Sequence, residues 1–164
     1  MALFQNDPVE AMKAGMRRLA SAVSIVSLSD DDNQRHAMTV SSVTSLSDNP
    51  ASLLVCINKS AACSTAFRPE RLFAINILKN HQQDLSGICA GQEQGEQRFI
   101  KGNWAQEGSV PYLPDADASI FCKNVKIVEY GTHIIVIGNV EKVITADDEP
   151  RPLLYLNGSY HTLS

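Results

Sequence analysis

Short runs of apolar residues separated by polar turns dominate this chain, and they predict strands more often than helices. Residues 23–28, 71–78, 118–130 and 133–145 are each rich in Val, Ile, Leu or Phe. Runs of this length, bounded by Gly, Pro, Asn and Asp, are typical of strands. Together with residues 37–58 they predict roughly seven or eight antiparallel strands, which favours a mainly β fold such as a barrel or a sandwich.

Two asparagines within these runs lead to specific expectations. Asn76 stands alone within the apolar run 71–78, and a buried amide needs hydrogen-bond partners. We expect a structural bond to a neighbouring strand or loop, in preference to a contact with a ligand. Asn124 marks a bulge in the run 118–130.

Residues 36–60 carry the most unusual pattern. Two strand-like runs, 37–46 and 52–58, flank the turn signal at 47–50. The second run is apolar on both faces, which predicts a buried central strand. The first run alternates only loosely and offers hydroxyls on both faces. One of its faces is therefore expected to meet something polar other than the core.

The helical pattern is strongest at residues 7–20, where Asn6 or Asp7 supplies the cap and Pro8 suits the first turn. Its apolar face is expected to pack over the end of a barrel or on a partner subunit. The residues of that face are Val9, Met12, Met16 and Leu19.

Two shorter helices are predicted further along the chain. One spans residues 61–67 and follows Ser60, which is a good N-cap. The other spans residues 81–90 and ends at Gly91.

Length and charge narrow the class of protein. At 164 residues the chain is expected to form a single domain over residues 1–164. A net charge of −4 argues against a nucleic-acid partner, which requires a basic surface. The sequence has neither a membrane-length apolar run nor the pattern of a signal peptide, so we expect a cytoplasmic protein without a membrane partner.

The cysteines and histidines do not predict a metal site. Cys56, Cys63, Cys89 and Cys122 form no C-x-x-C pair, and the four histidines have no H-x-x-x-H spacing. Disulfides are not expected in a cytoplasmic protein. Cys56 lies within an apolar run and is interpreted as a small core residue.

A cluster of hydrogen-bond donors follows the buried run 52–58. A buried strand beside a hydroxyl-rich strand, with donors at its exit, suits a flat ligand that carries a phosphate. Backbone amides would line the flat edge, and the start of the helix at 61–67 would attract the anion. The alternative is an ordinary Ser/Thr-rich edge hairpin. The residues that would hold the phosphate are Lys59, Ser60, Ser64 and Thr65.

Three segments resemble the flavin reductase family that serves two-component flavin-dependent monooxygenases, including the reductase component of 4-hydroxyphenylacetate monooxygenase. They are residues 37–58, residues 131–140 and a closing strand at 152–161, in the order that the family has them. Ala37 stands where a Gly is frequent, Ala51 where a second Pro is frequent, and Thr132 where many members have Asp. The change at Thr132 indicates a subfamily.

The resemblance implies an FMN-binding split β-barrel with peripheral helices, usually a homodimer, with the flavin near the subunit interface. It implies that backbone N–H groups near Ser41, Ser42 and residues 56–58 recognise the ring. The flavin-binding set implied is Met38, Thr39, Val40, Ser41, Ser42, Cys56, Ile57, Asn58, Lys59, Ser60, Ser64, Thr65, Arg98 and Phe99.

Other roles stay open at this point. Arg98 either faces the flavin phosphate or forms a structural ion pair, whereas Phe99 anchors its loop in the core. Trp104 is expected to be a packing anchor rather than a stacking partner of the flavin. The residues expected on the nicotinamide side are His133, with Tyr160 and His161 as weaker candidates.

The activity implied is that of an NAD(P)H:flavin oxidoreductase that supplies reduced FMN or FAD to an oxygenase component. Hydride would pass from nicotinamide C4 to flavin N5, so no side chain is assigned a catalytic role. The alternative is a non-enzymatic flavin-binding protein of the same fold, for storage or sensing. The residues do not choose between FMN and FAD, or between NADH and NADPH.

Overall fold

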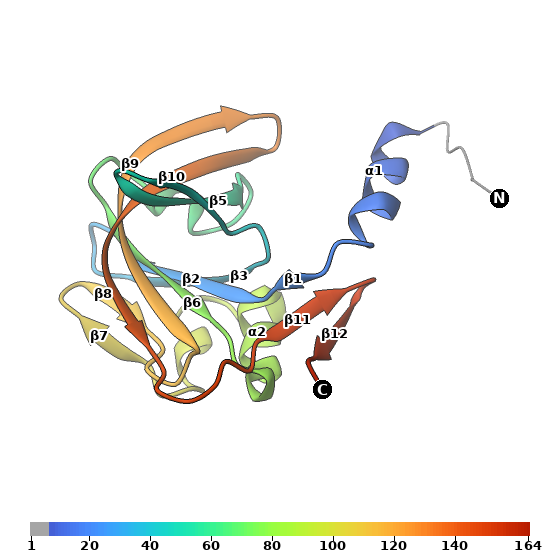
Figure 1. Cartoon of the computed structure of the whole chain (residues 1–164). Helices are drawn as coiled ribbons and strands as arrows, with labels where there is room; N and C mark the ends of the chain where they lie inside the picture. The colour runs from blue at the N-terminus through green and yellow to red at the C-terminus, as the bar shows by residue number, and fades with distance from the viewer. Residues whose placement is uncertain (1–6) are drawn as a thin grey trace.

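The computed structural model describes residues 7–164, and antiparallel sheets dominate it (Figure 1). The large sheet has seven strands in the order β3-β2-β6-β9-β10-β5-β4. A three-stranded sheet β1-β11-β12 and the hairpin β7-β8 accompany it. These strands are β1 (Ser21–Ala22), β2 (Ser24–Ser29), β3 (Arg35–Val40), β4 (Thr44–Asp48), β5 (Ala51–Asn58), β6 (Leu72–Ile77), β7 (Ala105–Glu107), β8 (Val110–Tyr112), β9 (Ala118–Tyr130), β10 (His133–Thr145), β11 (Leu153–Leu156) and β12 (Ser159–Thr162).

The helical segments are short and lie outside the large sheet. They are the α-helices α1 (Pro8–Met16) and α2 (Gln83–Gly87), the 3₁₀ turns η1 (Ser64–Ala66), η2 (Asn80–Gln82) and η4 (Gly95–Phe99), and the π-turn η3 (Ile88–Gln92). The fold is therefore mainly β with peripheral helices, as the sequence predicted.

The large sheet curls but does not close. Strands β3 and β4 follow one another in the chain, yet they form the two opposite edges of the sheet. The prediction of one strand over residues 37–46 was therefore wrong: β3 ends at Val40, β4 begins at Thr44, and residues 41–43 cross between the edges. This arrangement is consistent with the expected split barrel.

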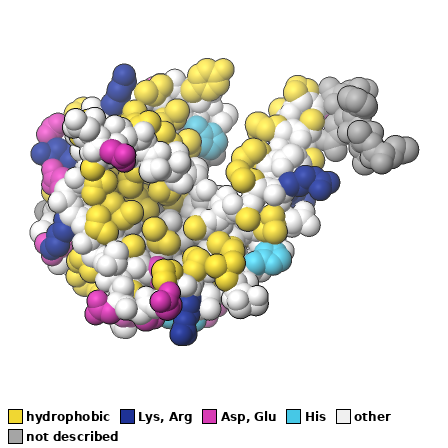
Figure 2. All heavy atoms as spheres, in the orientation of Figure 1, with side chains coloured by type: hydrophobic (Ala, Val, Ile, Leu, Met, Phe, Trp, Pro, Cys, Tyr) yellow, Lys and Arg dark blue, Asp and Glu magenta, His cyan; other side chains and the backbone are white. Residues whose placement is uncertain are grey.

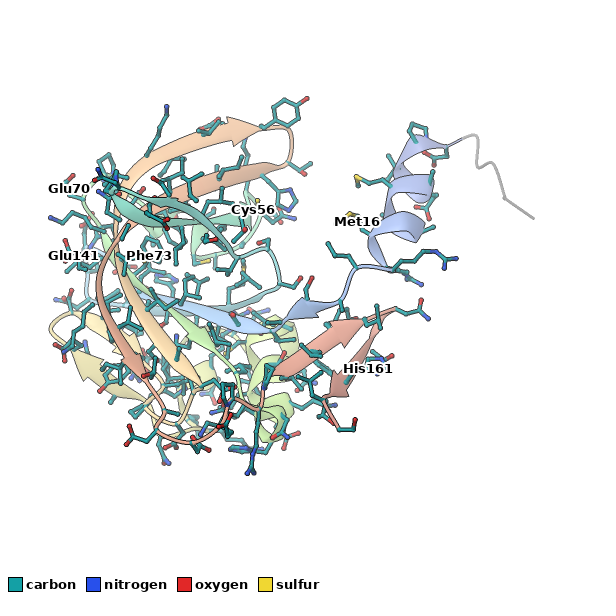
Figure 3. The ribbon with its side chains drawn as sticks, viewed as in Figure 1. Met16, Cys56, Glu70, Phe73, Glu141 and His161 are labelled. Atoms are coloured by element: carbon teal, nitrogen blue, oxygen red, sulfur yellow. The ribbon has the colours of Figure 1, made fainter. Side chains whose placement is uncertain are left out.

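The longest strands follow the sequence closely. Strands β9 and β10 have the predicted bounds, and their register shifts opposite Gly138, next to Asn124, where the bulge was predicted. Gly138 is needed for close packing at this bulge. A Cβ atom there would lie 2.6 Å from Cζ of Phe73 and 2.8 Å from Cβ of Cys122. Phe73 is buried in the core (Figure 3).

Asn76 has the structural role predicted for it. Its side chain is fully buried on β6 and makes four hydrogen bonds. Nδ2 donates to the Ile25 carbonyl and the Ser27 hydroxyl, both at 2.9 Å. Oδ1 accepts from the Leu113 amide at 2.9 Å and from the Ser119 hydroxyl at 3.0 Å. The amide thus ties the loop before β9 to the sheet.

The helix predicted at residues 7–20 is shorter in the structure. Asp7 caps α1, because its carboxylate accepts a hydrogen bond from the Val9 amide at 2.9 Å. The alternative cap, Asn6, lies outside the described residues. The helix ends at Met16 and buries none of its residues. Its apolar side chains are therefore left exposed in a single chain.

Three further predicted elements were inaccurate. The helix expected at 61–67 is only the 3₁₀ turn η1, because residues 59–63 form successive turns. The helix expected at 81–90 is broken into η2, α2 and η3, and Gly91 has a φ of 129°. The closing strand is the hairpin β11–β12, which turns at Asn157 and Gly158 with positive φ values. Asn and Gly favour such a turn.

Within residues 7–164, no helix has the length and apolar character needed to cross a membrane.

The packing around Gly138 gives a first prediction. Gly138→Ala should lower the free energy of unfolding by about 1–3 kcal/mol, because the new methyl group overpacks a dense core. Urea denaturation measures this change. Gly15→Ala is the matched control: it places the same methyl group on α1 with nothing within 4 Å, so it should not destabilise the protein. Equal stabilities of wild type and Gly138→Ala would contradict the packing argument.

Candidate functional site

Two open strand edges face the split in the large sheet. Strand β3 pairs with β2 on one side only. Strand β5 pairs with β10 along its length, but β4 covers it only from Ala51 to Leu54. The outward backbone groups of β3 and of residues 55–58 therefore lack a neighbouring strand. Such groups need other partners.

A single hydroxyl supplies hydrogen-bond partners for some of these unpaired backbone groups. Ser42 Oγ donates to the Cys56 carbonyl at 3.1 Å and accepts from the Cys56 amide at 3.2 Å. It thus takes the place of a strand partner for Cys56. Ser42 makes these contacts from residues 41–43, which lie between the end of β3 and the start of β4. It also fixes the crossing loop 41–43 against β5.

The antiparallel ladders show which other groups face the split, because outward and paired residues alternate along a strand. The Lys59 amide bonds to Thr132 O at 2.9 Å, so residues 55, 57 and 59 face β10. The Asn58 amide therefore points the same way as that of Cys56. On β3, the Ala37 carbonyl accepts from Arg98 and so faces outward. The Thr39 amide shares that direction.

Neither the Thr39 amide nor the Asn58 amide has a hydrogen-bond partner within residues 7–164. The split therefore has a free backbone donor on each side. Of the amides predicted to recognise a flat ligand, that of Asn58 is free, whereas that of Cys56 is occupied by Ser42. Cys56 and β5 lie below the β9–β10 hairpin in the side-chain view (Figure 3).

A cavity of about 770 Å³ continues from the β3 edge. Its walls are residues 34–37, residues 60–63, residues 94–96 and Arg98. Arg98 donates from Nε to the Glu93 carbonyl at 2.8 Å and from Nη1 to the Ala37 carbonyl at 2.5 Å. No carboxylate of residues 7–164 forms an ion pair with it. The guanidinium is thus a fixed, uncompensated positive charge in the wall.

The turn after β5 adds unpaired amides to the same cavity. The Asn58 side chain accepts from both the amide and the hydroxyl of Ser60, each at 2.9 Å. This shapes a turn in which the amides of Ala62 and Cys63 have no partner in the described chain. Successive free N–H groups of this kind bind anions. Arg98, which the resemblance already implied, and these backbone amides together form a candidate anion site.

The side chains predicted to hold the anion are mostly engaged elsewhere. The Ser60 hydroxyl donates to Asn58, and the Ser64 hydroxyl donates to the Lys59 carbonyl at 2.9 Å. The Lys59 ammonium lies 3.3 Å from Glu129 on the surface. Thr65 lines a separate depression with Asp30, Asp31 and Asp32 among others. Of these four residues, only Ser60 lines the cavity with Arg98.

Several predicted residues contribute backbone or core packing instead of a contact side chain. Val40 and Ile57 are buried in the core. The Met38 thioether lies 3.9 Å from the Cys63 thiol. Phe99 is buried and packs on Trp104 with ring centroids 4.7 Å apart, so both are packing anchors.

A buried serine that sequence reasoning missed links the site to the C-terminal hairpin. The Thr39 hydroxyl donates to the Ser86 carbonyl at 2.6 Å, and the Ser86 hydroxyl lies 2.8 Å from the Tyr160 hydroxyl. Ser86 is fully buried on α2. Its only signal in the sequence is a polar residue on the inward face of a predicted helix.

The histidines predicted for the nicotinamide side lie far apart. His133 begins β10, in register with Asn58, and its Nδ1 lies 2.8 Å from the Thr132 hydroxyl. His161 is exposed on β12, well away from Cys56 (Figure 3). Tyr160 reaches the β3 edge through Ser86, whereas His161 has no such connection among the bonds that the structure gives.

The cysteines near the cavity do not have the properties of nucleophiles. Burial raises the pKa of the Cys63 and Cys89 thiols to about 11, with Arg98 opposing this shift. Both thiols therefore stay protonated near neutral pH, and the reactive form is the thiolate. Within residues 7–164, no three His, Cys, Asp or Glu side chains gather as a metal site would require.

A family model described as "Flavin reductase like domain" matches residues 16–164. The chain belongs to this flavin reductase family.

Named relatives agree with the family. The reductase component of FADH(2)-dependent resorcinol hydroxylase from Rhizobium sp. (strain MTP-10005) is 39% identical over 149 residues, covering 88% of this chain and 82% of that protein. The NADH:riboflavin 5'-phosphate oxidoreductase of Streptomyces pristinaespiralis is 34% identical over 155 residues, covering 93% of this chain and 87% of that protein. The solved structure of flavin reductase HpaC complexed with NADP+ superposes with a TM-score of 0.85 at 26% identity. The match covers 94% of this chain and 97% of that one.

The bridging hydroxyl gives the second prediction. Ser42→Ala should destabilise the protein by about 1–2 kcal/mol, because it leaves the Cys56 amide and carbonyl without their partner. Thermal unfolding in parallel with the wild type measures this. Ser41→Ala is the control, since Ser41 is exposed and its hydroxyl makes no hydrogen bond within the described residues. If both variants melt at the wild-type temperature, Ser42 does not hold the split.

Proposed function

We propose that this protein is an NAD(P)H:flavin oxidoreductase formed by one domain over residues 1–164. It would reduce FMN or FAD and supply the reduced flavin to an oxygenase component. The observation that carries the proposal is the donor-lined split that leads into a cavity with the uncompensated Arg98. The names of the relatives support the same class of reaction.

The residues present fit a flavin in both of its parts. A flat ring with polar edges suits the facing amides of Thr39 and Asn58. A phosphate suits Arg98, because a guanidinium makes strong charge-assisted hydrogen bonds to phosphate oxygens. The free amides of Ala62 and Cys63 add donors to the same anion. The cavity lies beside β3, so ring and phosphate would follow one strand edge.

The chemistry that the bound cofactors supply is hydride transfer from nicotinamide C4 to flavin N5. The protein's contribution is orientation and electrostatics. Backbone donors fixed along the split would stabilise negative charge that develops on the polar edge of the ring. They need no reorganisation, because both strands are held by the sheet and by Ser42. No side chain has to act as a general acid or base.

The nicotinamide side is proposed to lie at the β10 end of the site. His133 is exposed and in register with Asn58, so a nucleotide stacked over the split would come within its reach. We propose that His133 orients the nucleotide by a hydrogen bond. Tyr160 would act indirectly, through Ser86 and Thr39.

We also propose a homodimer, on the basis of α1. The helix projects from the body, and its apolar side chains face a gap (Figure 2). A cavity of about 690 Å³ lies there, between α1, residues 41–44 and the β11–β12 hairpin. A nine-residue helix is marginal in water without tertiary packing. Light scattering tests this by measuring the mass in solution. A mass of twice 17.9 kDa supports the dimer, and a mass of 17.9 kDa contradicts it.

A non-enzymatic flavin-binding protein is the rival function. Steady-state oxidation of NADH and NADPH, assayed with FMN, FAD and riboflavin in parallel, separates the two. Turnover that depends on added flavin supports the reductase. Tight flavin binding without oxidation of either nucleotide favours the rival, and absence of both overturns the site itself.

The charge on Arg98 gives the third prediction. Arg98→Gln should weaken FMN binding about tenfold or more, since a hydrogen bond to a charged group contributes about 1.5–3 kcal/mol. Riboflavin, which has no phosphate, should lose about twofold at most. Fluorescence titration with both ligands measures this. Equal losses for the two ligands would show that Arg98 acts through structure and not through the phosphate.

His133 gives the fourth prediction. His133→Ala should raise the KM for NADH about threefold to tenfold, as expected for one lost hydrogen bond, with FMN affinity changed less. Initial-rate kinetics at saturating FMN and a separate FMN titration give the two values. His161→Ala is the control, because His161 lies apart from β5. An unchanged KM in His133→Ala would remove this residue from the nucleotide side.

A further inference from the structure

Three consecutive outward positions on β3 form a line along the open edge. The Asp30 amide bonds to the Gln34 carbonyl, so along the same register residues 36, 38 and 40 make the hydrogen bonds to β2. The backbone groups of residues 35, 37 and 39 therefore face away from β2. Position 39 borders the split, and position 37 carries the contact to Arg98. Position 35 lies about 6–7 Å further along, at about 3.3 Å a residue. A ligand that extends past Arg98 along this edge therefore meets Arg35.

Arg35 is held rigidly at that position. Its Nε lies 3.1 Å from Glu96 Oε1, and its Nη2 lies 2.6 Å from Glu96 Oε2. The guanidinium also sits over the Phe99 ring, 4.2 Å from its centroid. The two-bond geometry and the stacking are the arrangement in which an arginine–carboxylate pair is best defined.

The pair contributes no net charge to the cavity wall. Its hydrogen bond with Arg35 lowers the pKa of Glu96, so the carboxylate stays ionised near neutral pH. Both residues line the same cavity as Arg98. In this wall, the uncompensated charge of Arg98 lies beside Ala37, and the Arg35–Glu96 pair follows it along the edge. The pair is neutral overall, but it places the Glu96 carboxylate in the wall.

We propose that the Arg35–Glu96 ion pair makes this protein select a flavin with one terminal phosphate, FMN, over the dinucleotide FAD. This rests on the proposed function. The single phosphate of FMN ends at Arg98. The second phosphate and the adenosine of FAD must continue past Ala37 and lie against the pair, where Glu96 repels the phosphate. Arg35 cannot compensate, because its charge is already matched.

The two partners of the pair provide a sharp test, because they should act in opposite directions. Glu96→Gln frees the charge of Arg35 for the second phosphate, so the ratio of the FAD to the FMN dissociation constant should fall about fivefold or more. Arg35→Met leaves Glu96 unmatched, so the ratio should rise. A merely structural pair would move the ratio the same way in both variants, or not at all.

The experiment is titration of the full-length wild type and variants with FMN and with FAD, at one low and one high salt concentration. Glu149→Gln is the control for net charge, since it removes a carboxylate outside the cavity. Its ratio should equal that of the wild type. The shifts in the two pair variants should shrink at high salt, as electrostatic effects do.

The outcomes separate this inference from the proposed function. A wild type that binds FMN more tightly than FAD, with opposite shifts in the variants, supports the selection. Equal affinities of the wild type for FMN and FAD, or an unchanged ratio in Glu96→Gln, overturn the selection while leaving the reductase intact. Absence of any flavin binding or flavin-dependent NADH oxidation overturns both. Circular dichroism identifies a variant that does not fold. If one of the two ion-pair variants fails in this way, the ratio measured with the other variant decides the test.

Discussion

Backbone hydrogen bonding at a sheet that does not close is the constraint on which this structure depends. A strand with a neighbour on one side only leaves half of its backbone groups without a strand partner, and β3 and the second half of β5 are in this position. The Ser42 hydroxyl satisfies both backbone groups of Cys56. The amides of Thr39 and Asn58 keep their donors free. In the proposed function, this open edge is the surface that recognises a flat polar ligand.

Charge balance distinguishes the parts of the cavity beside this edge. Several charged residues in the described chain are matched: Arg35 with Glu96, Arg71 with Asp31 and Lys79 with Asp148. Arg98 is tethered by two carbonyl groups, which orient it without cancelling its charge. The wall therefore has a positive position and a neutral one in succession. In the proposed function, the first position would bind the phosphate, and a longer ligand would also pass the second.

The periphery of the molecule connects to this edge in two ways. The C-terminal hairpin reaches Thr39 through Tyr160 and the buried Ser86, so β12 and α2 support β3 from behind. Helix α1 does the opposite, because it leaves its apolar side chains uncovered beside residues 41–44. A partner subunit that covered α1 would lie next to the crossing loop. Assembly and ligand binding would then be coupled through the same short segment.

The sequence by itself determined the β class of the fold, the bounds of β9 and β10, the bulge at Asn124 and the structural role of Asn76, because these follow from local patterns of apolar and polar residues. It also predicted that residues 38–42 and 56–60 form the centre of the site. It did not reveal the break between β3 and β4, the absence of a helix after Ser60, the bridging role of Ser42, or the contact between Ser86 and Thr39. Nor did it show that Thr65 faces Asp30 to Asp32 rather than the cavity. Only the tertiary structure decided these, because each depends on which strand edges remain unpaired and on contacts between residues far apart in the chain.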